Sequence, residues 1–346
     1  MGNEKSESHE VNLPEGTSKA TIVINNQSTR GKSVWLKVFL ALSIVINVAL
    51  FTMYRSYFQE PNQPKEKFHS GDPAAADKVA IIPVEGIIYG ANTTQILKAI
   101  ERAREDDAVK AALLAVDSPG GGAPDSHQIY HELKKLSAVK PVYVQMKKYA
   151  ASGGLYVAMG AGTEGKIFAE PTTWTGSIGV IIPRFDLTGM EDKFGITAAP
   201  IKSAPLKDSP SPFRKLTEEE QAVWDAIIKD SLGLFTGVIV ENRANLDEEK
   251  VEALATGQVY TASQALNNGL VDEIGYEEDS LKALGEKAGF DPEDVRIIEY
   301  YTEKTLPEIL LGTSATGSID EQWQALLEST IPRAMYLCSW LPLGAE

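Results

Sequence analysis

The sequence predicts an α/β domain built on a largely parallel sheet, preceded by a single transmembrane helix. From about residue 78 onward, short apolar runs alternate with stretches of helical periodicity, and this alternation is typical of parallel sheets covered by helices. Upstream, residues 38–54 carry no charged side chain and are mostly apolar, which is about the length of a minimal membrane span.

Composition limits the kinds of partner and of site. The chain has 346 residues and a formal net charge of −15, and an acidic balance argues against nucleic acid, which binds clustered Lys and Arg. Its length suffices for one large core or for two domains. The single cysteine, Cys338, excludes an internal disulfide and any metal site built from cysteines.

The N-terminal part divides into two segments. Residues 1–33 are polar and rich in Ser, Asn, Glu and Thr, so we expect a disordered cytoplasmic head. Residues 34–54 form the expected transmembrane helix, with Lys37 as its only charge. A buried globular helix is disfavoured by the polar flanks, and a cleaved signal peptide by the absence of a small-x-small site. Basic residues are balanced on the two sides, so charge alone does not orient the helix.

Three further segments complete the expected organisation. Residues 55–77 are expected to be a linker, because prolines interrupt them and a run of alanines follows. The folded domain is expected over residues 78–300. A C-terminal extension over residues 301–346 is a candidate for a role in assembly.

Within the folded domain, apolar runs and helical periodicity predict the elements in order. Strands are expected at residues 79–84, 86–90, 109–116, 141–146, 166–169 and 174–182. Shorter helices are expected at residues 94–104, 126–136, 187–194, 247–255 and 263–267, with another beginning at 155. Thr217, followed three residues later by Glu220, is a capping-box pattern that opens a long helix toward Arg243.

Ser152 lies where the strand at 141–146 gives way to the helix that begins near 155. A hydroxyl at this place meets the free N–H groups and the dipole of a helix N-terminus. The small residues of Ala150-Ala151-Ser152-Gly153-Gly154 allow a substrate backbone to approach closely. These are the requirements of a nucleophilic serine. A plain helix N-cap is the alternative for this position.

The stretch 117–122, Asp-Ser-Pro-Gly-Gly-Gly, follows the strand at 109–116. Its glycines expose backbone N–H groups, and one of them could hold an oxyanion together with the N–H of Gly153. A plain turn between strand and helix is the alternative. A phosphate-binding loop is disfavoured, because no Gly-Lys-Ser/Thr follows at the required offset.

A serine nucleophile needs a base, and no histidine follows Ser152 in the sequence. His127 and His131 precede it, four residues apart on a predicted helix, where a solvated helix face is the simpler interpretation. They could also suggest a metal site, but no third ligand is evident, and we expect neither a metal nor a cofactor. Lysine is the remaining base, provided that burial lowers its pKa from about 10.4 toward 7–8. Lys207 lies in an apolar setting, and Lys202 competes with it.

Five motifs together resemble the signal peptide peptidase A family in its short, single-repeat form. Three surround the residues already discussed: the 117–122 turn, Ala150–Gly154, and Thr175-Gly176-Ser177-Ile178-Gly179-Val180. A fourth is Ile201–Asp208, and a fifth combines residues 258–262 with 269–272. The resemblance covers about residues 78–275 and places a membrane anchor upstream, as found here.

The resemblance implies a serine–lysine peptidase on a ClpP/crotonase-like fold. Ser152 would be the nucleophile and Lys207, rather than Lys202, the general base. Ser177 would hydrogen-bond the lysine and help to hold it neutral. The oxyanion would be bound by backbone N–H groups of Gly153 and Gly120, with Gly121 as a weaker candidate for the latter place.

The resemblance also implies where such a protein works and with what. It implies a homo-oligomer whose catalytic domains lie on the extracytoplasmic side of the inner (cytoplasmic) membrane, with a single-pass anchor. Its substrates would be signal peptides left in the membrane and apolar unfolded segments. Two features depart from the family: extra residues near 160–165, and Pro205-Leu206 where the family often has smaller or polar residues.

Two other interpretations share parts of this pattern. A crotonase-type acyl-CoA enzyme would use the same fold and oxyanion loop, but would not need Ser152 or Lys207. A catalytically inactive membrane-associated scaffold would keep the fold without the chemistry. Labelling by a serine-directed fluorophosphonate separates the peptidase from both.

Overall fold

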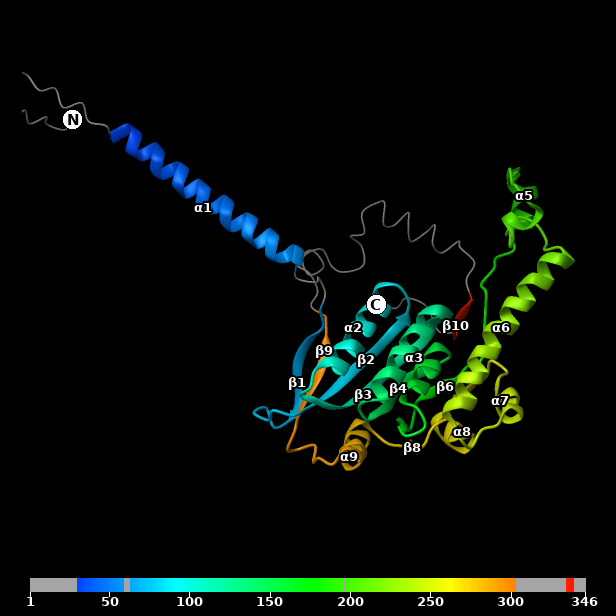
Figure 1. The fold of residues 1–346 in the computed structure, drawn as a ribbon. Helices are drawn as coiled ribbons and strands as arrows, with labels where there is room; N and C mark the ends of the chain where they lie inside the picture. The colour runs from blue at the N-terminus through cyan, green and yellow to red at the C-terminus, as the bar shows by residue number, and fades with distance from the viewer. Residues whose placement is uncertain (1–29, 59–62, 196, 303–333, 339–346) are drawn as a thin grey trace, which may run out of the picture. The chain divides into compact units, whose positions relative to one another are not determined.

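The computed structural model describes residues 30–58, 63–195, 197–302 and 334–338 (Figure 1). The chain divides into two compact units, residues 1–61 and residues 62–346. Most of the expected head (1–33) and most of the C-terminal extension (301–346) lie outside the described residues.

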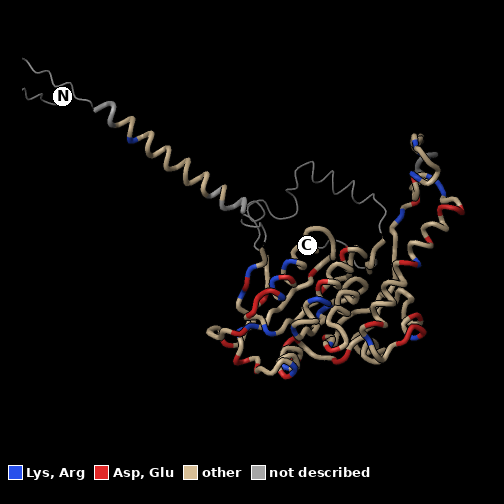
Figure 2. Tube along the Cα trace, in the orientation of Figure 1, with Lys and Arg blue, Asp and Glu red and all other residues tan. Residues whose placement is uncertain are grey.

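The first unit contains one long helix, α1 (Arg30–Phe58). Its window Val34–Phe51 has a mean hydropathy of 2.3, and none of the window is buried within the protein. Eighteen helical residues span about 27 Å at 1.5 Å per residue, close to the thickness of a bilayer core. Figure 2 shows this stretch as largely free of charged side chains. The helix is therefore suited to be a membrane anchor or a signal sequence.

The second unit is built on one ten-stranded sheet whose main path runs β1-β9-β2-β3-β4-β5-β8. The strands of this path are β1 (Lys65–Gly71), β2 (Lys78–Ile88), β3 (Val109–Gly122), β4 (Val142–Ala151), β5 (Ile167–Ala169), β8 (Glu273–Ile274) and β9 (Arg296–Tyr301). Only the edge pair β1–β9 is antiparallel, and the other five pairs are parallel. The predicted α/β class with a largely parallel sheet is confirmed.

Three short strands branch from this path and frame the site described below. They are β6 (Trp174–Gly176), β7 (Val259–Thr261) and β10 (Met335–Leu337). Strand β6 runs parallel to β4 and antiparallel to β7, while β10 lies antiparallel to the end of β3.

Among its described residues, the second unit has eight helices and two 3₁₀ turns. They are α2 (Ala91–Glu105), α3 (Ala123–Ser137), α4 (Gly153–Ala158), α5 (Thr188–Phe194), α6 (Glu218–Asn242), α7 (Glu248–Leu254), α8 (Ala262–Asn267) and α9 (Glu277–Ala288), with 3₁₀ turns η1 (Met159–Ala161) and η2 (Pro205–Asp208). All of the helices except α5 pack near the sheet and cover its two faces (Figure 1). On β3, Leu114 joins the core under α2, α3 and α4, whereas Leu113 joins the core under α9. This alternation is the period of two expected of a sheet buried on both faces.

Several strand boundaries differ from the predictions. The strand expected at residues 174–182 ends at Gly176 as β6, because Gly176 and Ser177 both have positive φ, 78° and 50°. The strands expected at residues 79–84 and 86–90 form the single strand β2. Strand β1 lies inside the expected linker, 55–77, because an antiparallel edge pairing with β9 orders residues 65–71 despite their polar sequence. Strand β3 continues through the glycines to Gly122 instead of ending at Val116, since both β2 and β10 pair with its last residues.

Residues 184–222, here named the arm, project from the sheet and contain α5, η2 and the first turn of α6 (Figure 1). Residues 197–207 of the arm are all exposed. Farther along α6, Phe235 and Ile239 are fully buried in the main core. The arm is thus anchored through the second half of α6 and carries its own loop outward.

Candidate active site

Ser152 occupies a strained corner between β4 and α4. Its backbone has φ 53° and ψ −113°, and Ser177, with φ 50°, is the only other non-glycine residue with positive φ among the described residues. Such conformations cost about 1–3 kcal/mol each and cluster at functional sites. Both strained residues are serines that the sequence had singled out.

The Ser152 hydroxyl is not used as a helix cap. The residue stands at the N-cap position of α4, yet its side chain makes no capping hydrogen bond. It is 1% exposed, and its Oγ has no hydrogen-bond partner among the described residues. A buried unpartnered hydroxyl is unfavourable for folding, so the N-cap alternative does not explain this serine.

Backbone hydrogen bonds hold Ser152, which follows β4, close to Ser177, which follows the neighbouring strand β6. The Ser152 N–H donates to the carbonyl of Gly176 at 2.7 Å, in continuation of the parallel pairing of β4 with β6. Ser177 follows Gly176 directly, and its own N–H donates to the carbonyl of Gln258 at 2.7 Å. The fold therefore brings Ser177 to the corner that carries Ser152.

The two glycines expected to bind an oxyanion lie against each other. Gly120 has φ +100°, and a Cβ added to it would lie 2.6 Å from the backbone nitrogen of Gly153. However, the Gly120 N–H donates to Ser118 Oγ at 3.0 Å, and that hydroxyl donates to the carbonyl of Gly86 at 2.6 Å. The position of Gly120 fits the expectation, but its N–H is already occupied in this state.

Strand β10 lies across these glycines as an extended segment. Tyr336 pairs with Gly121 of β3, and on its other side Met335 exchanges two hydrogen bonds of 3.0 Å with Ile181. The carbonyl oxygen of Tyr336 would overlap a Cβ on Gly120, so only glycine fits beneath it. A carbonyl group thus rests on the surface that we expected to bind an oxyanion.

The side chain of Tyr336 fills an aromatic pocket. It is 2% exposed, stacks on Tyr156 with ring centroids 5.0 Å apart, and contacts the ring of Phe235 at 4.8 Å. Its hydroxyl donates to the carbonyl of Ser231 in α6 at 2.7 Å. Burial raises the pKa of Tyr336 to about 12, so the phenol remains a neutral donor at physiological pH. The pocket accepts a large aromatic side chain and satisfies its hydroxyl.

Comparison with known proteins places this arrangement in a family. Residues 134–291 match the model described as "Peptidase family S49". The chain is 35% identical to the "Putative signal peptide peptidase SppA" of Enterococcus faecium over 84% of both chains. It is 40% identical to the "Putative protease slr0021" of Synechocystis sp. over 68% of this chain and 83% of that protein. The chain belongs to peptidase family S49.

Similar solved structures are remote. A mutant of the membrane-bound stomatin-specific protease 1510-N aligns with a TM-score of 0.42 and 18% identity, covering 65% of this chain and 98% of that one. A ClpP1 mutant from Listeria monocytogenes aligns with a TM-score of 0.39 and 16% identity, covering 58% and 93%. The family assignment rests on the sequence matches, which identify this S49 member as a serine-type peptidase.

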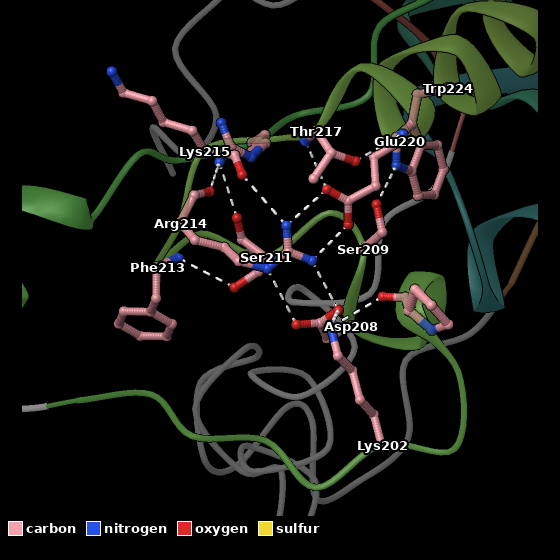
Figure 3. A network of polar contacts seen from close by, with 12 residues as sticks. Lys202, Asp208, Ser209, Ser211, Phe213, Arg214, Lys215, Thr217, Glu220 and Trp224 are labelled. Carbon is pink, nitrogen blue, oxygen red and sulfur yellow. Dashed lines mark hydrogen bonds and ion pairs between the residues drawn. The ribbon is translucent and has the colours of Figure 1, made fainter.

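The two candidate lysines of this S49 peptidase differ in their surroundings. Lys202 Nζ donates to Asp208 at 2.7 Å and to the carbonyl of Pro205 at 3.0 Å (Figure 3). Lys207, in η2, is exposed and lines an open hollow of about 570 Å³ formed by residues 198–200 and 207–213. Because Ser152 Oγ has no partner among the described residues, one chain alone does not join it to Lys207.

An ionic network fixes the loop that carries both lysines (Figure 3). Arg214 donates to Asp208 at 2.8 Å and to Glu220 at 2.5 Å, and Glu220 also accepts from the N–H of Thr217 in the capping box. Hydrogen bonds from Arg214, and then from Lys202, lower the pKa of Asp208 to about 2. The Arg214 contact likewise lowers the pKa of Glu220, whose side chain is 1% exposed. The network ties η2 to the start of α6.

Neither His127 nor His131 is a hydrogen-bond partner of Ser152, whose Oγ has none among the described residues. His127 Nδ1 hydrogen-bonds the hydroxyl of Tyr156 at 2.7 Å. Within the described part of the chain, no group of three His, Cys, Asp or Glu side chains is placed to hold a metal ion. The metal interpretation of His127 and His131 therefore gains no support.

The sequence analysis missed several residues that shape the site. Tyr336 gave no local signal, because its partners lie in distant parts of the chain. Arg214 had a weak signal, since a basic residue between Asp208 and a capping-box glutamate could have suggested an ionic bridge. Ser118 and Ser126 were passed over because a serine near a glycine turn is ordinarily a turn residue.

Proposed function

We propose that this S49 peptidase is a membrane-anchored endopeptidase that cleaves apolar peptides, with Ser152 as nucleophile and Lys207 as general base. One observation carries the proposal: the buried, strained and unpartnered hydroxyl of Ser152 stands beside the Gly120–Gly153 surface, on which a backbone carbonyl already rests. A hydroxyl kept in this state at a cost in stability is available for chemistry.

Strand β10 supplies the geometry for substrate binding. A peptide that replaced it would add an antiparallel strand to the end of β3 and pair with Ile181 on its other side. Strand addition of this kind draws affinity from backbone hydrogen bonds and specificity from side-chain pockets. The scissile carbonyl would then lie where the Tyr336 carbonyl lies, with the residue before the cleaved bond in the aromatic pocket.

In the proposed reaction, Ser152 Oγ attacks the scissile carbonyl while the neutral amine of Lys207 takes the hydroxyl proton. The Gly153 N–H donates to the oxyanion, and the lysine then returns the proton to the leaving amine. Water repeats the sequence and releases the acyl group. Ser177, held beside Ser152 by the β4–β6 pairing, would hydrogen-bond the lysine amine and favour its neutral form.

The base would come from a neighbouring copy of the chain. Ser152 is buried without a partner, whereas Lys207 stands exposed on the projecting arm. Among the described residues, the Ser152 hydroxyl has no base beside it, and the Lys207 amine has no nucleophile beside it. In an oligomer, the arm of one copy would bring Lys207 to the Ser152 corner of the next copy. Lys202 is the weaker candidate, because its amine already donates to Asp208 and to a carbonyl.

The apolar helix and the named relatives support the proposed substrate class and location. The apolar window of α1 would hold the enzyme at the inner membrane in a single pass, with the catalytic unit on the extracytoplasmic side. One relative is named as a putative signal peptide peptidase. Apolar peptides released in the membrane, such as cleaved signal peptides, would then be the substrates nearest to the active site.

Covalent labelling tests the proposal. The full chain in detergent is treated with a fluorophosphonate and digested, and we expect a single adduct on Ser152 together with hydrolysis of a fluorogenic apolar peptide. Ser152→Ala should lose the adduct, and Ser203→Ala, a change on the exposed arm, should keep it. A folded oligomer that neither reacts nor hydrolyses would instead support the scaffold or the acyl-CoA enzyme.

A further inference from the structure

Ser126 has a second buried hydroxyl without a partner, close to Ser152. It lies in the first turns of α3, directly after the glycines that end β3. The residue is 0% exposed, and its Oγ makes no hydrogen bond to any described residue. Since buried hydroxyls in native proteins are nearly always hydrogen-bonded, this one requires an explanation.

The Ser126 hydroxyl faces the surface that carries the Tyr336 carbonyl. A Cβ built on Gly153 would lie 2.6 Å from Ser126 Oγ, 3.0 Å from the carbonyl oxygen of Tyr336 and 3.1 Å from Gly120 Cα. The hydroxyl, the carbonyl and the two glycines therefore surround one point in space. A side chain at position 153 would separate them, and glycine leaves the space open.

The backbone donors expected from the glycine stretch are engaged in this state: Gly121 pairs with Ile88 of β2 and with Tyr336 of β10, and Gly120 is also occupied. The Gly153 N–H is the first donor, but the N–H of Gly120 is engaged by Ser118 Oγ at 3.0 Å. Ser118 is itself fixed by its hydrogen bond to Gly86, so releasing Gly120 would disturb two bonds. An oxyanion is normally held by at least two preorganised donors, each worth a large factor in rate.

We propose that Ser126 is a catalytic residue whose hydroxyl donates the second hydrogen bond to the oxyanion. As the Ser152 oxygen adds to the scissile carbonyl, the carbonyl oxygen gains negative charge and accepts the Ser126 O–H. The Ser126 proton is never transferred, and the bond weakens again when the carbonyl re-forms. This inference rests on the proposed function, because it assumes that Ser152 is the nucleophile.

Stability and activity should respond in opposite directions to the loss of this hydroxyl. Removing an unpartnered buried hydroxyl leaves folding unharmed or improves it, because no hydrogen bond is lost. We therefore expect Ser126→Ala to melt at or above the wild-type temperature. The same variant should lose roughly 10²- to 10³-fold in kcat with little change in KM, as is found when an oxyanion donor is removed.

The test compares full-length wild type, Ser126→Ala, Ser126→Cys and the control Ser137→Ala. Ser137 lies on the same helix, and its Oγ bonds its own turn at Lys134. Each is assayed for peptide hydrolysis, for melting temperature, and for binding of a peptide aldehyde and of the matching alcohol. Only the aldehyde forms a tetrahedral adduct with the nucleophile, so Ser126→Ala should weaken it selectively. Cysteine, a weak donor of similar size, should fall between serine and alanine.

The outcomes separate this inference from the proposed function. If wild type does not react with fluorophosphonate at Ser152, the proposed function itself fails. If wild type reacts and hydrolyses peptide while Ser126→Ala keeps kcat within about twofold, well short of the loss expected for an oxyanion donor, Ser126 is not a donor. Equal losses of aldehyde and alcohol binding, together with a lower melting temperature, would show a structural role and would also overturn the inference.

Discussion

The Ser152 corner and the Lys207 arm are opposites in construction. The corner is buried, and neighbouring strands fix its backbone in conformations that serine rarely adopts. Residues 197–207 of the arm are exposed, and ion pairs of Arg214 with Asp208 and Glu220 hold this loop against the start of α6. Rigid burial suits a nucleophile that must keep one geometry, whereas an exposed loop suits a group that acts on another copy. The contrast supports the proposal that Ser152 and Lys207 of two different copies form one catalytic pair.

Removing the Ser152 hydroxyl or the Lys207 amine should lower kcat more than any other change considered. We expect Ser152→Ala to lower kcat about 10⁴- to 10⁶-fold, and Lys207→Ala about 10²- to 10⁴-fold, the usual contribution of a general base. The matched control Lys202→Ala should retain a substantial fraction, since its amine serves the loop. Steady-state hydrolysis of a fluorogenic peptide measures all three. If Lys202→Ala were inactive and Lys207→Ala fully active, Lys202 and not Lys207 would be the general base.

Mixing inactive variants tests whether the two regions meet across copies. When Ser152→Ala and Lys207→Ala chains are dissociated and reassembled at equal amounts, about a quarter of the sites should combine an intact serine with an intact lysine from a neighbour. Activity should therefore return to roughly that share of wild type. Each variant reassembled with itself is the control. If the pair forms within one chain, the mixture stays inactive.

The Arg214 network should determine the pH below which the arm loop loses its fixed structure. It should not determine the pH dependence of catalysis. The pKa of Asp208 is lowered to about 2 from 3.8, so its contribution to stability is complete above about pH 4 and is lost as the pH falls toward 2. We expect limited proteolysis within residues 197–213 to begin only below about pH 4, and already at pH 7 in Arg214→Ala. Arg214→Lys should be partly protected. Identical cleavage of all forms at pH 7 would exclude a fixing role for Arg214.

Peptidase activity should increase as the pH is raised into the alkaline range. A lysine base must lose its proton before it can act, so kcat/KM should rise with pH through neutrality and above, while the arm stays folded. An activity plateau that extends down to pH 5 would contradict a lysine base.

Substitution of Tyr336 should change activity least. It tests whether β10 occupies the place of a substrate strand. Truncating a side chain that is 2% exposed lowers the melting temperature. If β10 occupies the place of a substrate strand, Tyr336→Ala should also raise kcat/KM for a short peptide by roughly two- to tenfold, because a larger fraction of sites is open. Tyr300→Ala, at an equally buried tyrosine in β9, should lower stability without any gain in activity.

Local patterns predicted the parts of this site that depend on neighbours in sequence. Ser152 was recognisable because a strand, small residues and a helix follow one another within a few positions. The long helix α6 was recognisable from its capping box, which the structure shows with both reciprocal hydrogen bonds. The alternation of strands and helices likewise predicted the parallel sheet.

Long-range pairing explains what the sequence could not show. The polar residues of β1 become a strand only because β9 lies beside them, and β10 is defined by pairing with glycines far earlier in the chain. The engagement of the Gly120 N–H by Ser118 depends on a turn geometry that composition does not encode. In the proposed arrangement Lys207 meets Ser152 of a second copy, and no pattern in one chain can specify such a contact.

Cys338 gives the molecule a built-in reporter. It is the only cysteine of the sequence, it is 1% exposed, and its N–H bonds the carbonyl of Pro119 at the end of β10. A thiol reagent can reach Cys338 only when β10 separates from β3. The rate of alkylation therefore measures how often β10 separates, and no probe has to be introduced. Faster alkylation on adding a peptide would mean that the peptide occupies the groove that β10 has left and so keeps Cys338 accessible.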